Sequence, residues 1–140
     1  MCPNGGISDQ QAVAEVPAIS IQPRRGPGLL RVSLPIRTAK LVVVDLAGEI
    51  DLASCGDLRE SLQVAVEIVR RGGRVVVDLS GVSFLAVCGL RCLLEADVAL
   101  RARDVQLGVV ANTQAVRIPL TTLRQTRPLR VFSSLALACA

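Results

Sequence analysis

The sequence predicts one α/β domain, in which a mostly parallel, mixed β-sheet of four to five strands packs with about four helices. Three observations lead to this prediction. The length of 140 residues suits one domain. Hydrophobic residues make up 51% of the chain, which is enough for a buried core. Segments with helical periodicity also alternate with short apolar runs, a pattern typical of parallel sheets covered by helices.

The first 28 residues are expected to form a flexible leader. They contain four of the seven prolines and four of the eleven glycines, and they end in Pro23-Arg-Arg-Gly-Pro-Gly28. Order should begin near Leu29, so the folded domain is predicted to span residues 29–140.

Two β-prone runs open this domain, Leu29–Leu34 and Leu41–Leu46. The segment between them contains Pro35, which favours a turn. The two runs are therefore predicted to pair as antiparallel strands.

The first helix is predicted over Ser54–Arg71. Ser54 followed by Asp57 resembles a capping box, and Gly72-Gly73 ends the helix. The apolar positions share one helical face: Leu58, Leu62, Ala65, Val66 and Val69. The run Arg74–Leu79 that follows is almost continuously apolar, as in a strand that is buried on both faces.

A second helix is predicted to begin near Cys88 and to end by Arg103. A strand follows at Val105–Ala111. Asn112 or Thr113 is expected to cap a third helix.

Pro119 is expected to limit this third helix. A short strand at Leu129–Phe132 and a last helix capped by Ser133 complete the chain. The predicted order is therefore β-β-α-β-α-β-α-β-α.

The composition favours a binding protein over a catalyst. Histidine is absent, which excludes Ser-His-Asp and Cys-His nucleophile systems and metal sites that contain histidine. Phe84 and Phe132 are the only aromatic residues, so a site of stacked aromatics is excluded. No glycine-rich loop precedes the single lysine, Lys40, which excludes a Walker nucleotide site. No catalytic residue, metal site or cofactor is expected.

The net charge of +4 is unevenly distributed. Between Asp45 and Glu67 there are six acids and one base, and this acidic stretch suits a basic patch on a protein partner. From Arg101 onward there are six arginines and one acid. Nucleic acid is not the expected partner, but the basic tail leaves nucleic-acid binding open as an alternative. The arginines in question are Arg117, Arg124, Arg127 and Arg130.

The five cysteines are irregularly spaced and make a poor disulfide framework. No apolar run reaches the roughly 18 residues needed to span a bilayer, and no signal peptide is visible. We therefore expect a cytoplasmic protein with mostly free thiols and no membrane contact. Cys88 and Cys92, four residues apart on one helix, have poor disulfide geometry. Cys88 lies at a predicted helix start, where the helix dipole stabilises a thiolate. A redox sensor that uses Cys88 is therefore a further alternative function. The simpler interpretation is that Cys88 is a small, half-buried residue that fills the turn.

Two segments carry a recognisable pattern, VVVDLAGEIDLASCGDLRESL at Val42–Leu62 and RVVVDLSGVSFLAVCGLRCLL at Arg74–Leu94. The strongest parts are Gly48-Glu49-Ile50-Asp51 and the run from Asp78 to Phe84. In this order and spacing they resemble the STAS family, which comprises anti-sigma factor antagonists and the cytoplasmic domains of sulfate transporters. The resemblance spans residues 29–140.

The resemblance implies a regulatory protein that is not an enzyme. In the family, an anti-sigma factor with kinase activity phosphorylates a serine in an Asp-Ser-Ser-Gly turn at the start of the second helix. The unphosphorylated antagonist binds the anti-sigma factor and frees the sigma factor. The resemblance therefore implies a kinase-like anti-sigma factor as the partner, and a homodimer is left open.

In this sequence the corresponding turn reads Ala86-Val87-Cys88-Gly89. Cys88 stands at the acceptor position, and Ser80 and Ser83 do not match it, so serine phosphorylation at this turn is not expected. The chain is then a constitutively competent antagonist, a thiol-regulated one, or a divergent binder with another partner.

The resemblance also implies where the partner binds. Glu49, Asp51 and Ser54 are expected to lie close to the helix start at Cys88 and Gly89 and to form the binding edge with it. Gly89 is expected to allow close approach of a partner's backbone.

Overall fold

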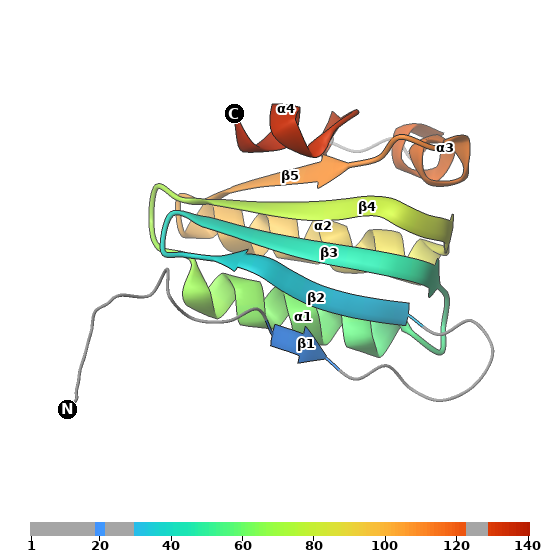
Figure 1. The fold of residues 1–140 in the computed structure, drawn as a ribbon, viewed down its shortest axis with the longest axis horizontal. Helices are drawn as coiled ribbons and strands as arrows, with labels where there is room; N and C mark the ends of the chain where they lie inside the picture. Colours follow the sequence, from blue (N-terminus) through green and yellow to red (C-terminus); the bar gives the residue numbers. More distant parts are fainter. Residues whose placement is uncertain (1–18, 22–29, 123–128) are drawn as a thin grey trace.

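Six strands pair into one mixed sheet in the computed structural model, which describes residues 19–21, 30–122 and 129–140 (Figure 1). The strands are β1 (Ile19–Ile21), β2 (Leu30–Arg37), β3 (Leu41–Ile50), β4 (Arg74–Leu85), β5 (Gln106–Val110) and β6 (Arg130–Phe132). The helices are α1 (Cys55–Ile68), α2 (Val87–Ala102), α3 (Gln114–Thr122) and α4 (Leu135–Cys139). The strands lie side by side in chain order. The first two pairings are antiparallel and the other three are parallel.

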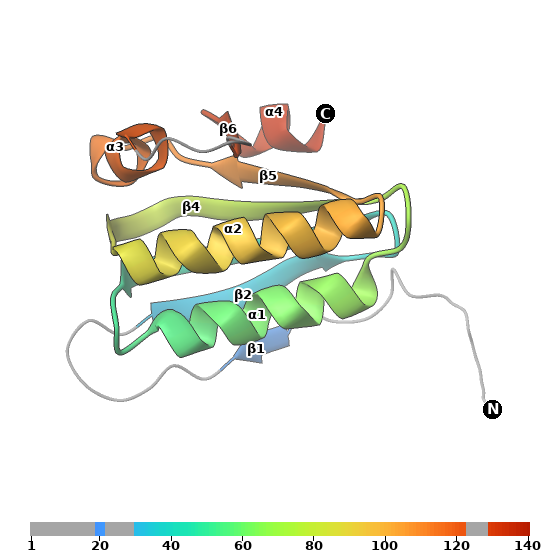
Figure 2. The ribbon, with the colours of Figure 1, turned by 180° about the vertical axis from the view of Figure 1, so that it is seen from behind.

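Helices α1 and α2 lie next to each other on one face of the sheet, and α4 packs on the other (Figures 1 and 2). This arrangement follows from the parallel pairs, because each parallel connection must cross over the sheet through a helix. The predicted α/β fold class is confirmed. The sheet of the described residues has six strands instead of four to five, because β1 adds an edge strand to β2.

Alternate residues of the central strands fill two separate cores. The larger core lies under α1 and α2, and the smaller one lies under α4. Valines dominate the central strands because both faces of these strands are covered. From β3 the larger core takes Val42, Val44 and Leu46, and from β4 it takes Val75, Val77 and Leu79, whereas Val43 and Val76 belong to the smaller core.

One strand lies within the expected leader, because residues 19–21 form β1 and pair with β2. The other residues of the expected leader, 1–18 and 22–28, lie outside the described residues. The domain boundary at residue 29 remains a prediction.

Pro35 lies inside β2 and not in the turn where it was expected. The β2–β3 register shifts between Ser33 and Ile36, and this irregularity accommodates a residue that has no N–H to donate. The turn falls at residues 38–40, where the Thr38 hydroxyl donates to the Leu41 carbonyl at 3.0 Å and accepts from the Leu41 N–H at 2.9 Å.

Pro119 does not limit the third helix, since α3 continues to Thr122. A single missing N–H removes one backbone hydrogen bond, which this short, largely exposed helix tolerates. The last helix is capped by Ser134 instead of Ser133, because the Ser134 side chain accepts from the Leu137 N–H at 3.3 Å.

Candidate functional site

The ends of β3 and β4 bring the predicted site residues together. Glu49 pairs with Phe84 and Ile50 with Leu85, so the two parallel strands end side by side. The Ala86 N–H donates to the Ile50 carbonyl at 2.8 Å, which holds the start of α2 against the end of β3. We call residues 49–55 and 84–89 the partner edge.

The turn between β3 and α1 is fixed by its own polar side chains. Asp51 Oδ1 accepts from the N–H groups of Ala53 and Ser54 at 3.0 and 3.1 Å. The Ser54 hydroxyl donates to the Glu49 carbonyl at 2.8 Å and accepts from the Asp51 N–H at 2.9 Å. Because Ser54 is only 4% exposed, it shapes the turn from inside, whereas the Glu49 side chain faces solvent.

The predicted capping box is therefore wrong. The Ser54 side chain makes no capping hydrogen bond to α1, because its hydroxyl is already used by the turn that precedes the helix. Asp57, its expected partner, is buried in the first turn of α1.

Gly89 is needed for packing inside the chain. A β-carbon at this position would lie 2.4 Å from Ile50 Cγ2 and 2.9 Å from Leu85 Cδ1. Gly89 is itself buried, so the close approach that it permits is between α2 and the ends of β3 and β4. The approach of a partner's backbone at Gly89 stays a prediction.

The expectation of mostly free thiols is wrong for two cysteines, because Cys55 and Cys88 form a disulfide. They begin α1 and α2, whose first turns lie side by side, and their Cα atoms are 6.4 Å apart. This separation lies within the usual range for a disulfide. Among the described residues, Cys92 and Cys139 remain free. Burial raises the pKa of the Cys92 thiol, which keeps it protonated at neutral pH.

Three apolar side chains of the partner edge face solvent, and none of them was predicted as a site residue from the sequence. Leu52 is 86% exposed, Val87 is 64% exposed and Phe84 is 49% exposed. Leu52, an apolar residue in a polar turn, was the one sequence signal for this exposed group. Phe84 at a strand end and Val87 in a helix are ordinary residues for those elements, so neither indicates exposure. Exposed apolar side chains of this kind are typical of interaction surfaces.

The partner edge is also acidic. It contains Glu49 and Asp51 and neither lysine nor arginine. It therefore offers an apolar centre beside negative charge, which suits a partner surface that is apolar and basic.

A second acidic pair lies on the opposite face of the sheet from α1 and α2. Asp45 and Asp78 are register partners on β3 and β4. Burial, and next the charge of Asp78, raise the pKa of the Asp45 carboxyl. Asp78 also accepts hydrogen bonds from the N–H and the hydroxyl of Ser80 at 3.0 and 2.6 Å. Ser80 is thus engaged by the Asp78 carboxylate, and it lies on β4 seven positions before α2 begins at Val87.

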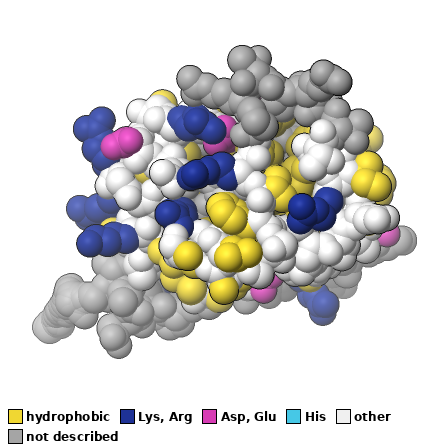
Figure 3. All heavy atoms as spheres, turned by 90° about the horizontal axis from the view of Figure 1, so that it is seen from above, with side chains coloured by type: hydrophobic (Ala, Val, Ile, Leu, Met, Phe, Trp, Pro, Cys, Tyr) yellow, Lys and Arg dark blue, Asp and Glu magenta, His cyan; other side chains and the backbone are white. Residues whose placement is uncertain are grey.

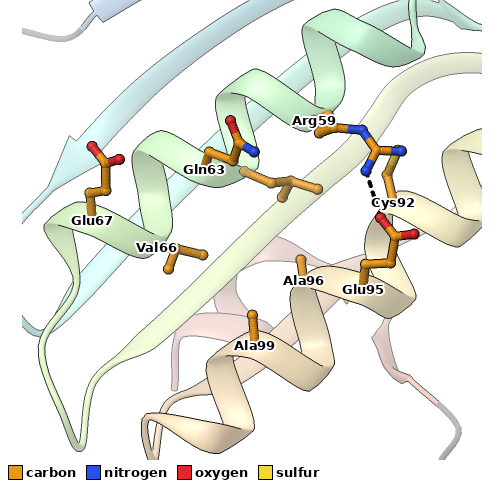
Figure 4. A pocket seen from close by; sticks show the side chains of 9 residues that line it. Arg59, Gln63, Val66, Glu67, Cys92, Glu95, Ala96 and Ala99 are labelled. Atoms are coloured by element: carbon orange, nitrogen blue, oxygen red, sulfur yellow. Dashed lines mark hydrogen bonds and ion pairs between the residues drawn. The ribbon is translucent and has the colours of Figure 1, made fainter.

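A groove of about 460 Å³ runs between α1 and α2, outside the partner edge (Figure 4). Its walls include Val66 and Ala99, and Arg59 and Glu95 form an ion pair across its top at 2.7 Å. Both of these charged side chains are more than half exposed, so the pair contributes little to stability.

The arginines considered for nucleic-acid binding are divided between described and undescribed parts of the chain. Arg124 and Arg127 lie outside the described residues. Arg117 donates to the Ala111 carbonyl at 2.7 Å, and Arg130 donates to Gln106 Oε1 at 3.0 Å. Figure 3 shows that basic side chains gather toward one end of the face that carries α4. Lys40 and Arg74 lie at that end, where β3 and β4 begin, far from the partner edge.

Within residues 19–21, 30–122 and 129–140, no group of three or more acidic, cysteine or histidine side chains is arranged to hold a metal ion. None of the helices in the described residues is both long enough and apolar enough to cross a membrane.

Comparisons with known proteins agree with this architecture. The model of the family described as "Mlab, STAS domain" matches residues 36–129. The anti-sigma-F factor antagonist RsfB of Mycobacterium tuberculosis is 32% identical over 95 residues, which are 68% of this chain and 75% of that protein.

Solved structures show the same fold. An anti-sigma factor antagonist from Mycobacterium paratuberculosis superposes with a TM-score of 0.63 at 24% identity, covering 91% of this chain and 95% of that one. The anti-sigma factor antagonist SpoIIAA in its unphosphorylated form superposes with a TM-score of 0.58 at 17% identity, covering 76% and 91%. The family match, the relative and the shared fold agree, and the chain belongs to the STAS domain family.

Proposed function

We propose that this chain is an anti-sigma factor antagonist, a regulatory protein without enzymatic activity. It binds a cytoplasmic anti-sigma factor of kinase-like fold and thereby releases a sigma factor for transcription. The observation that carries this proposal is the partner edge, which presents Leu52, Phe84 and Val87 to solvent beside two acids. The name of the relative RsfB, an anti-sigma-F factor antagonist, supports the same function.

The partner edge can contribute both affinity and orientation. Burying the three exposed apolar side chains supplies the hydrophobic contribution, at about 25 cal/mol for each Å² removed from water. Glu49 and Asp51 attract a basic patch and disfavour wrong partners. The internal hydrogen bonds of Asp51 and Ser54 hold the turn in one conformation, so that less entropy is lost on binding.

Regulation at the start of α2 differs from that implied by the family pattern. No hydroxyl is present in Ala86-Val87-Cys88-Gly89, so a kinase has no acceptor there. We propose that the chain is competent to bind without prior dephosphorylation. Incubation with the anti-sigma factor and ATP should leave residues 86–89 unmodified in a mass spectrum, whereas phosphate on Ser80 or Ser83 would contradict the assignment of the acceptor turn.

The binding experiment has a closely matched control on a single helix. Val87 and Val98 both belong to α2 and are 64% and 65% exposed, but only Val87 is part of the partner edge. Each is replaced by aspartate, and affinity for each anti-sigma factor of the source genome is measured by calorimetry. Displacement of a labelled sigma factor is measured in parallel.

We expect Val87→Asp to weaken binding by at least about tenfold, because a charge is then buried against an apolar partner. Val98→Asp should stay within about twofold of the parent chain. Equal effects of the two variants would exclude the partner edge as the contact surface. Absence of binding to every anti-sigma factor would overturn the proposed function itself.

A further inference from the structure

The Cys55–Cys88 disulfide joins the two segments of the partner edge. Cys55 is the first residue of α1 and Cys88 is the second residue of α2, and 33 positions separate them in the sequence. Both residues are partly exposed, so small thiols and disulfides can reach them. Val87 and Leu52, the most exposed apolar residues of the edge, are one and three positions away from these cysteines.

Neither of the joined helices has a side-chain cap. The Ser54 hydroxyl is engaged in the preceding turn, and Ala86, at the N-cap of α2, has no polar side chain. The first turn of α2 also lacks an acidic residue that would compensate the helix dipole. A missing cap destabilises a helix start. The disulfide therefore links two helix starts that lack this local support.

We propose that Cys55 and Cys88 are a site of reversible thiol–disulfide exchange that controls the partner edge. In the disulfide form the first turns of α1 and α2 are held together, and the edge is ordered for binding. In the dithiol form the uncapped first turn of α2 frays, and the anti-sigma factor binds more weakly because this turn must be ordered again. The control of binding rests on the function proposed above, whereas the effect on α2 does not.

The oxidant in this exchange is a low-molecular-weight disulfide such as oxidised glutathione. One cysteine thiolate attacks this disulfide and releases one glutathione thiol, which leaves a mixed disulfide on the protein. The second cysteine then displaces the other glutathione, so two protein S–H bonds become one S–S bond and the reagent is reduced to two thiols. Excess thiol reverses both steps.

The other described cysteines provide contrast. Cys92 lies one turn further along α2, but it is buried and its raised pKa disfavours the reactive thiolate. Cys139 lies in α4, which packs on the other face of the sheet. Cys139→Ser is therefore a matched control, because it removes a partly exposed thiol without touching the partner edge.

The first test needs no partner. The full chain is equilibrated with oxidised glutathione or with excess dithiothreitol, and its thiols are counted after unfolding in a blocking reagent. We expect three reactive thiols in the oxidised protein and five in the reduced one, since the chain has five cysteines. Five thiols in both samples would overturn the proposal.

Backbone hydrogen exchange then tests the effect on α2. The N–H groups of Gly89 and Leu90 donate to the Ala86 carbonyl at 3.0 and 3.1 Å and report on the first turn. We expect their protection to fall by about fivefold or more on reduction, the effect of losing a helix cap. The reduced parent and the double variant Cys55→Ser/Cys88→Ser should agree, and Cys139→Ser should respond to dithiothreitol as the parent does. Unchanged protection on reduction would overturn the proposal.

Affinity for the anti-sigma factor, measured in both redox states, completes the experiment. We expect oxidised protein to bind several-fold more tightly and the double variant to ignore dithiothreitol. Equal or tighter binding by the reduced form would overturn the control of binding and leave the proposed function standing. Failure of both forms to bind would instead overturn the proposed function, while hydrogen exchange still decides whether the disulfide orders α2.

Discussion

Gly89→Ala should destabilise the protein, although alanine is the better helix former. The added β-carbon would lie 2.4 Å from Ile50 Cγ2, whereas ordinary contact begins at 3.4 Å, so the two groups must separate by about 1 Å. Ile50 is fully buried, so its methyl group cannot move into solvent. Overpacking costs about 1–3 kcal/mol, and the gain in helix propensity is at most about 1 kcal/mol. We expect a net loss of about 1–2 kcal/mol in the free energy of unfolding.

Urea unfolding of the oxidised protein, followed by circular dichroism, measures this loss. Tryptophan and tyrosine are absent, so intrinsic fluorescence is not a suitable probe. Gly56→Ala is the control, because Gly56 is an exposed glycine in the first turn of α1, where the same substitution should be neutral or stabilising.

A double-mutant cycle with Ile50→Ala identifies the cause of the loss. Ile50→Ala removes the Cγ2 methyl group, so Gly89→Ala should cost much less in that background. An undiminished cost in the double variant would show that the clash with Ile50 is not responsible. A stability equal to that of the parent for Gly89→Ala alone would refute the whole argument.

Three further predictions concern stability. Removing the Cys55–Cys88 disulfide should lower the unfolding free energy by up to about 4 kcal/mol in the loop-entropy model for a separation of 33 residues, and urea unfolding with and without reductant measures this change. The pKa of Asp45 is raised by burial and by Asp78, so its stabilising contribution is present at low pH and is lost as pH rises through the folded-state pKa. Asp45→Asn should therefore raise the melting temperature at neutral pH, and this difference should shrink below about pH 4; a constant difference across pH would contradict this origin. Arg74 donates to the carbonyls of Ala138 in α4 and of Ala140 just after it, so Arg74→Ala should increase hydrogen exchange in α4 and cost about 1–3 kcal/mol, whereas an unchanged exchange rate would show that this anchor is dispensable.

The sequence was sufficient to predict most of the fold. The valine runs of β3 and β4 and the helical periodicity of α1 and α2 are strong local signals, so the type and order of the elements from β2 onward and the start of α2 near Cys88 were predicted correctly, whereas β1 was not predicted. Errors occurred where tertiary context decides the outcome. Pro35 was assigned to a turn because a proline usually ends a strand, but the irregular register of β2 accommodates it.

The candidate site was only partly predictable. The family pattern led to residues Glu49, Asp51, Ser54, Cys88 and Gly89, and the structure brings these residues together. Which of them shape the edge from inside and which face solvent depends on burial, and burial is not visible in a motif. The disulfide was missed because the lateral distance between two helix starts leaves no trace in cysteine spacing.

Arg74 also holds Ala138 and Ala140 beside the beginning of β4. Its guanidinium contacts the carbonyl of Ala140 at the beginning of β4, whereas the partner edge includes Leu85 at the end of the same strand (Figure 1). An extended strand of this length separates the two by roughly 35 Å. A fluorophore or affinity tag attached to Ala140 would therefore project from the far end of the sheet. Molecules immobilised through this residue on a sensor surface would all present the edge outward, in one orientation.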